Sequence, residues 1–456
     1  MSVRTPHGPF LGRTLEQLGT DLRSGRTTAV QLADEACTAA EKTHDLLNCF
    51  ITIDRAGSHA AAIKSDYELT NGYDRGPLHG IPIAIKDVIA TGGLRTTMAS
   101  QHFAEHEPLQ DADVVASLRA AGGIIMGKTN CHEFSYGIRG DVGAFGAAVN
   151  PYDPEKITGG SSSGSAVAVA AGIVPIALGT DTAGSVRVPA ALCGVVGFKP
   201  TTGSLSASGI FPLAPSFDTA GILCGSIADT ELVWNAVALQ GATHFQAART
   251  GPAVAEEIGV TVGALSDAAA MAGSVEVLDA FSRAVASLEA VGQEIRLVSL
   301  NSEYDFAKIY NVIRAAEAYV VHQELLAEAP EAYQPETLER IRAGETLTYS
   351  QVANSREEMQ RVRSVFLDRF RNFDIFITPT VPILAPDAAD NEPSIGPALL
   401  SLTVIWNVLG WPAVTIPVHV AGCNLPQSVQ LIAKPGMEGI LLMMAKKLEK
   451  CLAKNA

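Results

Sequence analysis

Basic residues are scarce in this sequence, and so are aromatic ones. Lys and Arg number 33 against 48 Asp and Glu, which gives a formal net charge of −15 at pH 7. An acidic chain without a long Lys/Arg run repels phosphate groups, so we expect no binding to nucleic acid or to anionic membranes. Although only 6% of the 456 residues are aromatic, 47% are hydrophobic, which suffices for a large buried core. This composition excludes a disordered or collagen-like chain.

The sequence also lacks the marks of disulfides, zinc sites and export. Its seven cysteines are an odd number, and no two of them have C-x-x-C spacing. We therefore expect reduced thiols in a cytoplasmic protein rather than a disulfide framework. These cysteines and the ten histidines form no zinc-type cluster in the sequence. The first residues, MSVRTPHGPFLG, contain no apolar h-region, so we expect no signal peptide.

No hydrophobic run is both long and uninterrupted. A glycine and a proline break the apolar stretch 164–180, and the same pair of residue types breaks 399–420. A buried helix followed by a buried strand explains each stretch more simply than a membrane span does. We therefore expect no membrane association.

Helical and strand patterns alternate along the chain. Amphipathic helical spacing occurs at 14–44 and 112–121 and recurs through 254–375. Apolar runs typical of strands lie at 78–89, 124–130, 373–382 and 413–420, and residues 166–181 fit a helix followed by a strand. Strands near both ends of the chain predict one large α/β sheet with helices on both faces, rather than a string of domains.

The densest chemical signal is the segment 159–190, GGSSSGSAVAVAAGIVPIALGTDTAGSVRVPA. A cluster from Ser161 to Ser163 lies in a glycine-rich loop, and Ser185 follows 24 residues after Ser161. Small residues before Ser185 let backbone N–H groups converge on one point, as an oxyanion site requires. Alone, the cluster is also typical of a helix N-cap or a solvated turn. A phosphate site is a further alternative, but the Gly-Lys-[Ser/Thr] of a P-loop is missing.

Lys86 lies inside an apolar run that is expected to form a strand. Burial disfavours the ammonium form, so a lysine in such a place has a lowered pKa. The neutral amine can then act as a base toward a serine hydroxyl. Because most lysines instead extend along the surface and keep their charge in water, Lys86 indicates catalysis only together with the serines.

These residues form a pattern that resembles the amidase signature family, over about residues 14–235 and again over 373–435. The segment 159–190 fits the signature throughout, from Gly-Gly-Ser-Ser to Asp-x-Ala-Gly-Ser-Val-Arg-Val-Pro. HGIPIAIKD at 79–87 is similar to the family's lysine strand, and GKTNCHEF at 127–134 is similar to its next strand and turn. A gapped pattern of this length is far more specific than a short glycine motif.

The resemblance implies a Ser-Ser-Lys triad. Ser185 would be the nucleophile, Ser161 the bridging serine at a cis peptide bond, and Lys86 the base. Lys86 would draw a proton from Ser161, and Ser161 one from Ser185, which attacks the amide carbonyl. Water would then hydrolyse the acyl-enzyme. The expected oxyanion donors are the backbone N–H groups of Thr182, Ala183, Gly184 and Ser185.

Other positions receive supporting roles from the same resemblance. Ser162 is expected to assist the triad by hydrogen bonding, and Asp181 and Arg187 to brace the loop. No metal and no organic cofactor is implied. The candidates for the acyl pocket, which are equally plausible as core residues, are Cys131, Phe134 and Trp406.

We therefore predict an α/β fold of the amidase signature type. It would be a large mixed β-sheet flanked by helices on both faces, with a helical insertion around 255–370. Residues 1–456 would form one amidase domain. Its parts would be a signature core at about 75–235, a helical, specificity-bearing region at about 240–370, and C-terminal strands at 373–435 that return to the sheet.

The predicted activity is hydrolysis of the C–N bond of a small amide by water, with release of ammonia or an amine. The amide would be aliphatic, aryl or of the carbamoyl/urea type. The alternative is the glutamine-hydrolysing subunit of a tRNA-dependent amidotransferase, although RIRAGE at 340–345 does not resemble the Arg-x-x-Leu-Gly run that is usual there. A catalytically inactive scaffold subunit is a third possibility, against which the complete triad argues. A homodimer is expected from the family, and the need for a small partner subunit stays open.

Overall fold

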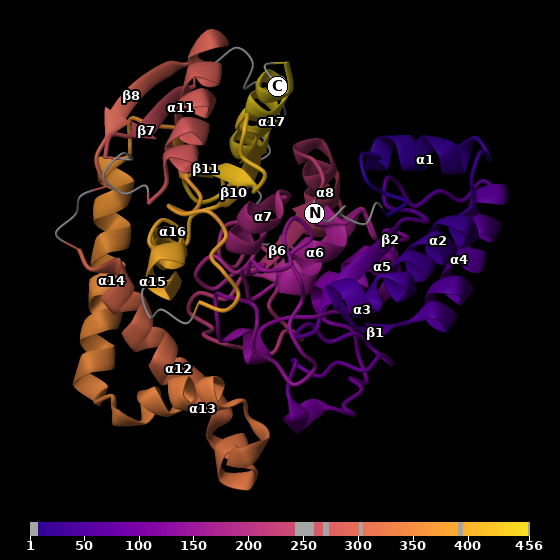
Figure 1. Ribbon diagram of the computed structural model, residues 1–456, viewed down its shortest axis with the longest axis horizontal. Coiled ribbons are helices and arrows are strands. Elements are labelled where there is room, and N and C mark those ends of the chain that lie inside the picture. Colours follow the sequence, from indigo (N-terminus) through magenta and orange to yellow (C-terminus); the bar gives the residue numbers. More distant parts are fainter. Residues whose placement is uncertain (1–7, 242–259, 268–272, 301–303, 391–394, 455–456) are drawn as a thin grey trace.

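An eleven-stranded mixed sheet organises the computed structural model of the chain (Figure 1). The structure describes residues 8–241, 260–267, 273–300, 304–390 and 395–454. The strands are β1 (Phe50–Ile53), β2 (Pro82–Lys86), β3 (Ile124–Thr129), β4 (Ile176–Thr180), β5 (Val196–Lys199), β6 (Ala220–Cys224), β7 (Thr261–Leu265), β8 (Glu294–Val298), β9 (Ile375–Pro379), β10 (Ala413–Val418) and β11 (Gln427–Ala433). Their order in the sheet is β1-β3-β2-β4-β6-β5-β10-β11-β9-β7-β8.

Helices cover the sheet on both faces, so the predicted fold class is confirmed. Figure 1 shows the first helices at the β1 end of the sheet, and α11 beside β7 and β8 at the other end. The α-helices are α1 (Leu15–Arg23), α2 (Ala29–Lys42), α3 (His44–Leu47), α4 (Arg55–Thr70), α5 (Asp113–Ala120), α6 (Ser163–Ala170), α7 (Arg187–Cys193), α8 (Ile227–Gly241), α11 (Val275–Ala290), α12 (Phe306–Glu328), α13 (Pro335–Arg342), α14 (Tyr349–Arg369), α15 (Ile395–Leu400), α16 (Val404–Leu409) and α17 (Glu438–Lys454).

The two interrupted apolar runs fold as expected. The first becomes α6 followed by β4, and most of the second becomes α16 followed by β10. No helix among the described residues is long and apolar enough to cross a membrane.

The registers of the central strands bring polar side chains to one edge of the sheet. β2 lies between β3 and β4 and runs parallel to both, with Ile85 opposite Leu178. All residues of these three strands are buried, which is typical of parallel strands covered on both faces. Because parallel strands end at the same edge, Lys86 at the end of β2 and Thr180 at the end of β4 become neighbours.

The predicted insertion is mainly helical, with α11, α12, α13 and α14 inside it. Of its range, residues 255–259, 268–272 and 301–303 lie outside the described residues. The region also adds β7 and β8, which the sequence pattern did not predict, in parallel with β9. β8 is short, forms the sheet edge and has no fully buried residue, so it lacks the apolar run by which we recognised the central strands.

Aromatic side chains join the helical region to the rest of the core. The ring centroid of Phe366 on α14 lies 5.2 Å from that of Phe306 on α12 and 5.5 Å from that of Phe370. Phe370 in turn lies 5.8 Å from Trp411, next to β10. Such pairs are stabilising beyond the area that they bury. This cluster fixes α12, which carries cavity residues described below, to the sheet.

Replacing Phe366 by alanine is expected to destabilise the protein by about 3–5 kcal/mol, because its fully buried ring would leave a cavity. The measurement is the midpoint of urea unfolding. Leu367→Ala is the matched control, since Leu367 is the next residue of the same helix and is 44% exposed. Equal shifts in the two variants would show that the aromatic cluster does not hold α14.

Candidate active site

Lys86 lies against two hydroxyl groups in the interior. Its Nζ is 2.7 Å from Ser161 Oγ and 2.7 Å from Thr180 Oγ1. The side chain is fully buried, and this burial lowers the pKa of Lys86 to about 8. At pH 7 roughly a tenth of the amines are then neutral, far more than for a free lysine. The neutral amine can accept a proton from Ser161 while it donates to Thr180.

Two other lysines are buried, and they show why a lowered pKa alone does not identify a base. Burial lowers the pKa of Lys128 to about 8 and that of Lys199 to about 7. Lys128 donates to the carbonyl of Ile89 and to a threonine hydroxyl, and Lys199 donates to the carbonyl of Pro200. Of the three, Lys86 is the one whose amine lies against the hydroxyl of a serine of the signature segment.

The serine loop before α6 joins the lysine to Ser185. The peptide bond between Gly160 and Ser161 is cis, as the family resemblance implied. The N–H of Ser162 donates to the carbonyl of Ser185 at 3.1 Å. Ser162 Oγ also donates to the carbonyl of Thr180 at 3.2 Å and accepts from its N–H at 3.3 Å. Ser162 therefore holds the loop of Ser161 against both the end of β4 and the backbone of Ser185.

Asp181 and Arg187 bracket the loop that carries Ser185. Arg187 Nε lies 3.0 Å from Asp181 Oδ2, and both side chains are fully buried. Burial alone would raise the pKa of Asp181, but the charge and hydrogen bonds of Arg187 outweigh it and lower this pKa to about 2. Arg187 also donates to the side chains of Gln430 and Asn407, at 3.0 and 2.6 Å. The bracket thus reaches from the signature segment to α16 and β11.

One of the expected oxyanion donors already makes a hydrogen bond within the protein. The N–H of Gly184 donates to Asp181 Oδ1 at 2.8 Å, which removes it from the set of free donors. Gly184 has φ = +131°, and a Cβ there would lie 2.5 Å from Thr403 Oγ1, so only glycine fits. In the described part of the chain, the N–H groups of Thr182, Ala183 and Ser185 have no hydrogen-bond partner.

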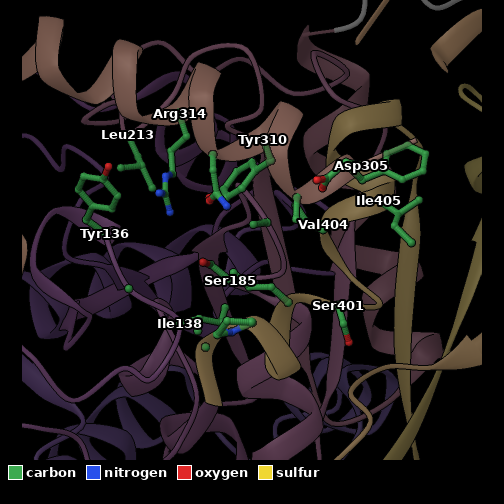
Figure 2. Close-up of a pocket in the computed structure, with 18 of the residues that line it drawn as sticks. Tyr136, Ile138, Ser185, Leu213, Asp305, Tyr310, Arg314, Ser401, Val404 and Ile405 are labelled. Carbon is green, nitrogen blue, oxygen red and sulfur yellow. The ribbon is translucent and has the colours of Figure 1, made fainter. Parts of the chain in front are cut away.

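Ser185 and Ala183 line a cavity of about 680 Å³ (Figure 2). This volume suits a small molecule. Much of the lining comes from α12 and α16, far from the signature segment in sequence. It includes Tyr136, Tyr310, Arg314, Arg340, Val404 and Ile405. The sequence placed the specificity-bearing residues in the helical region but offered no motif by which to single out Tyr310 or Arg314.

Thr180 is the other contact that the motif did not single out. A polar residue at the end of an apolar strand, next to Asp181, was the available signal.

The three acyl-pocket candidates lie outside the lining of this cavity. Trp406 is fully buried with its ring centroid 6.0 Å from that of Trp411, while its neighbours Val404 and Ile405 reach the cavity. Phe134 is fully buried among other rings, and its centroid lies 4.6 Å from that of His322. Cys131 is also buried, and burial raises the pKa of its thiol to about 12. A large apolar side chain near a motif fits core packing as well as a pocket.

All seven cysteines are free thiols. Within the described ranges, no group of three or more His, Cys, Asp or Glu residues is arranged to hold a metal ion.

Replacing Asp181 by asparagine is expected to cost about 3–5 kcal/mol of stability, because the buried charge of Arg187 would lose its partner. Since the folded pKa of about 2 lies below the ordinary 3.8, the pair stabilises above pH 3.8 and this contribution is lost as pH falls through 2. Urea midpoints between pH 2 and 7 measure both effects. Asp368→Asn, which breaks an exposed pair with Arg371, is the control. Equal midpoints for the two variants would contradict the bracket.

Comparisons with known proteins show the family of the chain. The family model described as "Amidase" matches residues 31–442. One relative, a glutamyl-tRNA(Gln) amidotransferase subunit of Lachnospira eligens, is 32% identical over 457 residues, which cover 93% of this chain and 95% of that protein. Further relatives at 31–34% identity carry the same name.

Comparison with solved structures indicates the same family. A crystal structure of an amidase is 33% identical with a TM-score of 0.87, over 96% of this chain and 100% of that one. The peptide amidase of Stenotrophomonas maltophilia is 26% identical with a TM-score of 0.85, over 98% of each chain. The resemblance seen in the sequence is thus confirmed: this amidase-type enzyme belongs to the amidase signature family.

Proposed function

We propose that the chain hydrolyses the amide bond of a small molecule through an acyl-serine intermediate on Ser185. The observation that carries the proposal is the 2.7 Å contact between Lys86 Nζ and Ser161 Oγ, on a loop bonded to the backbone of Ser185. Lys86 and Ser161 are closed off from solvent, whereas Ser185 lines the cavity. The proposed base is therefore shielded from water, and the proposed nucleophile is accessible to substrate.

These contacts support the proton path that the family resemblance implies. Neutral Lys86 accepts the proton of Ser161, which takes the proton of Ser185 as Ser185 Oγ attacks the amide carbon. The N–H groups of Thr182, Ala183 and Ser185 are free to stabilise the oxyanion. When the C–N bond breaks, Ser161 returns a proton to the departing nitrogen. A water molecule then attacks the acyl-serine by the same path, which releases the acid and restores Ser185.

A second candidate is the glutamine-hydrolysing subunit of a tRNA-dependent amidotransferase. The names of the curated relatives favour it over the stand-alone amidase that we expected first, and both chains are covered almost end to end. The solved structures named amidase and peptide amidase favour the stand-alone enzyme. Both candidates use the same triad, and the second also requires partner subunits.

Release of ammonia or amine by the purified chain distinguishes the two. The panel contains aliphatic, aryl, carbamoyl and urea-type amides together with glutamine. We expect turnover of at least one amide other than glutamine by the chain alone. Turnover of glutamine alone, or none until partner subunits are added, would establish the second candidate.

Ser185→Ala is expected to lower kcat by at least about 10⁴-fold, since no other group would form the acyl-enzyme. A serine-reactive fluorophosphonate should label the wild type and not this variant. Ser163→Ala is the matched control, because Ser163 is a buried serine of the same segment, at the start of α6, whose hydroxyl has no partner in the described structure. Labelling of the Ser185→Ala variant would remove the mechanism, and an unlabelled wild type would indicate an inactive scaffold.

Activity is expected to fall as pH is lowered through about 8, because the ammonium form of Lys86, which cannot accept a proton, then predominates. The profile of kcat/KM between pH 5 and 10 tests this. Lys86→Met should lose nearly all activity at every pH. A profile that stays flat down to pH 5 would refute the role of Lys86 as base.

A further inference from the structure

One cation in the cavity has no anionic partner. Arg314 extends from α12 into the cavity, and Figure 2 shows its guanidinium group between Tyr136 and Tyr310, directed toward the side on which Ser185 lies. The central carbon of the guanidinium is 5.0 Å from the ring centroid of Tyr136 and 5.1 Å from that of Tyr310. Both distances are in the range of cation–π contacts, so the two rings orient the charged group.

The polar contacts of Arg314 are incomplete. Its Nε is shielded from solvent and has no hydrogen-bond partner among the described residues. None of the described carboxylates lies within 4.0 Å of its guanidinium nitrogens. The residue is partly buried, and a charge withdrawn from water without a partner is costly, so a bound anion would relieve part of this cost.

The other arginine that lines the cavity has both a carboxylate partner and a hydrogen-bond acceptor. Arg340 pairs with Glu336 at 2.5 Å and donates to the carbonyl of Tyr136 at 2.8 Å. Its charge is therefore balanced within the protein, and its place beside Tyr136 is structural. Arg314 has no such internal counter-ion.

The nearby acids are either engaged or distant. Asp218 accepts hydrogen bonds from Thr182 Oγ1 and from the N–H groups of Leu213 and Ala214, at 2.7–3.0 Å. Asp305 caps the start of α12, nine residues before Arg314. At a rise of 1.5 Å per residue, the two positions lie about 13 Å apart along the helix. The cavity thus has a positive end at Arg314 and a negative end at Asp305.

We propose that Arg314 binds a carboxylate of the substrate, so that the enzyme selects small amides that carry one carboxylate, the half-amides of dicarboxylic acids. This inference rests on the proposed role of Ser185 as the nucleophile. A planar guanidinium group can hold a carboxylate through two parallel hydrogen bonds, and shielding from water strengthens such bonds. The carboxylate would supply the missing counter-ion while the amide at the other end of the molecule meets Ser185.

The same geometry bears on glutamine. Its ammonium group is on the same carbon as its carboxylate and would lie close to the charge of Arg314. Glutaramate, which is glutamine without the ammonium group, is therefore the better substrate on this proposal.

Three C5 amides provide the test, with kcat/KM measured for glutaramate, pentanamide and glutamine. Pentanamide has a methyl group where glutaramate has its carboxylate. We expect the wild type to favour glutaramate over each of the others by about 10- to 100-fold, the range of a charge-assisted hydrogen bond. Arg314→Gln should lower the ratio of kcat/KM for glutaramate to that for pentanamide by the same factor, mainly through a higher KM for glutaramate. Arg314→Lys should restore only part of this preference, because an ammonium group lacks the planar pair of donors.

Lys308→Gln is the matched control, since it removes one positive charge from an exposed position of the same helix. It should keep the preference for glutaramate. If Lys308→Gln and Arg314→Gln lower it equally, the effect is long-range charge, and the proposed contact is refuted. The half-amides of the four- and six-carbon dicarboxylic acids then report which chain length spans from Arg314 to Ser185.

Labelling of Ser185 by a fluorophosphonate tests the proposed nucleophile separately from the proposed carboxylate site. An unlabelled wild type would overturn the proposed nucleophile, and this inference with it. A labelled wild type that shows no preference for glutaramate over pentanamide would overturn this inference alone. If Arg314→Gln does not fold, protection of the wild type decides: glutaramate should slow labelling and pentanamide at the same concentration should not, and equal protection by both would refute the carboxylate site.

Discussion

The site depends on a lysine amine that is enclosed with hydroxyl groups rather than with a carboxylate. Lys86 Nζ has Ser161 and Thr180 as its close partners, and burial brings its pKa to about 8. A carboxylate at the same distance would have held the proton on the amine and removed its use as a base. The parallel ends of β2 and β4, and the serine loop that passes over them, are what create this enclosure. The fold thus positions one lysine whose ammonium group can lose its proton.

Three cations in the neighbourhood of Ser185 have three different kinds of partner. Arg187 is fully paired with Asp181 and further bonded to side chains from distant parts of the chain, so it serves to hold the loop of Ser185. Burial lowers the pKa of Lys86 to about 8, so that the neutral amine is far more accessible than in a free lysine. Arg314 lies between two aromatic rings with an unpartnered Nε. The roles that we propose for these three groups, in catalysis, in holding the loop and in substrate selection, follow from the partners that each one has.

The occupied N–H of Gly184 shows how closely scaffold and catalysis are joined. Asp181 uses one oxygen to hold this N–H, while its other oxygen lies against the guanidinium of Arg187. The loop is therefore fixed by the same carboxylate that neutralises the buried arginine. Among the residues that the structure describes, the N–H groups of Thr182, Ala183 and Ser185 have no hydrogen-bond partner, which is the condition for a site that stabilises a developing negative charge.

Local patterns in the sequence were sufficient for the family, the fold class, the strands β2, β3, β4, β9 and β10, and the segments that carry Lys86, Ser161 and Ser185. These follow from features with a short range along the chain: apolar runs, glycine-rich turns and a long gapped motif. The edge strand β8 was not predicted because an exposed edge does not require an apolar run. The buried strand β7 lies in a region whose pattern we interpreted as helical. The contact of Lys86 with Thr180, the capture of the Gly184 N–H and the place of Arg314 between Tyr136 and Tyr310 were decided by the tertiary structure alone. Each joins side chains from elements far apart in sequence, and the direction in which a side chain points on a helix such as α12 is settled only when the helix packs.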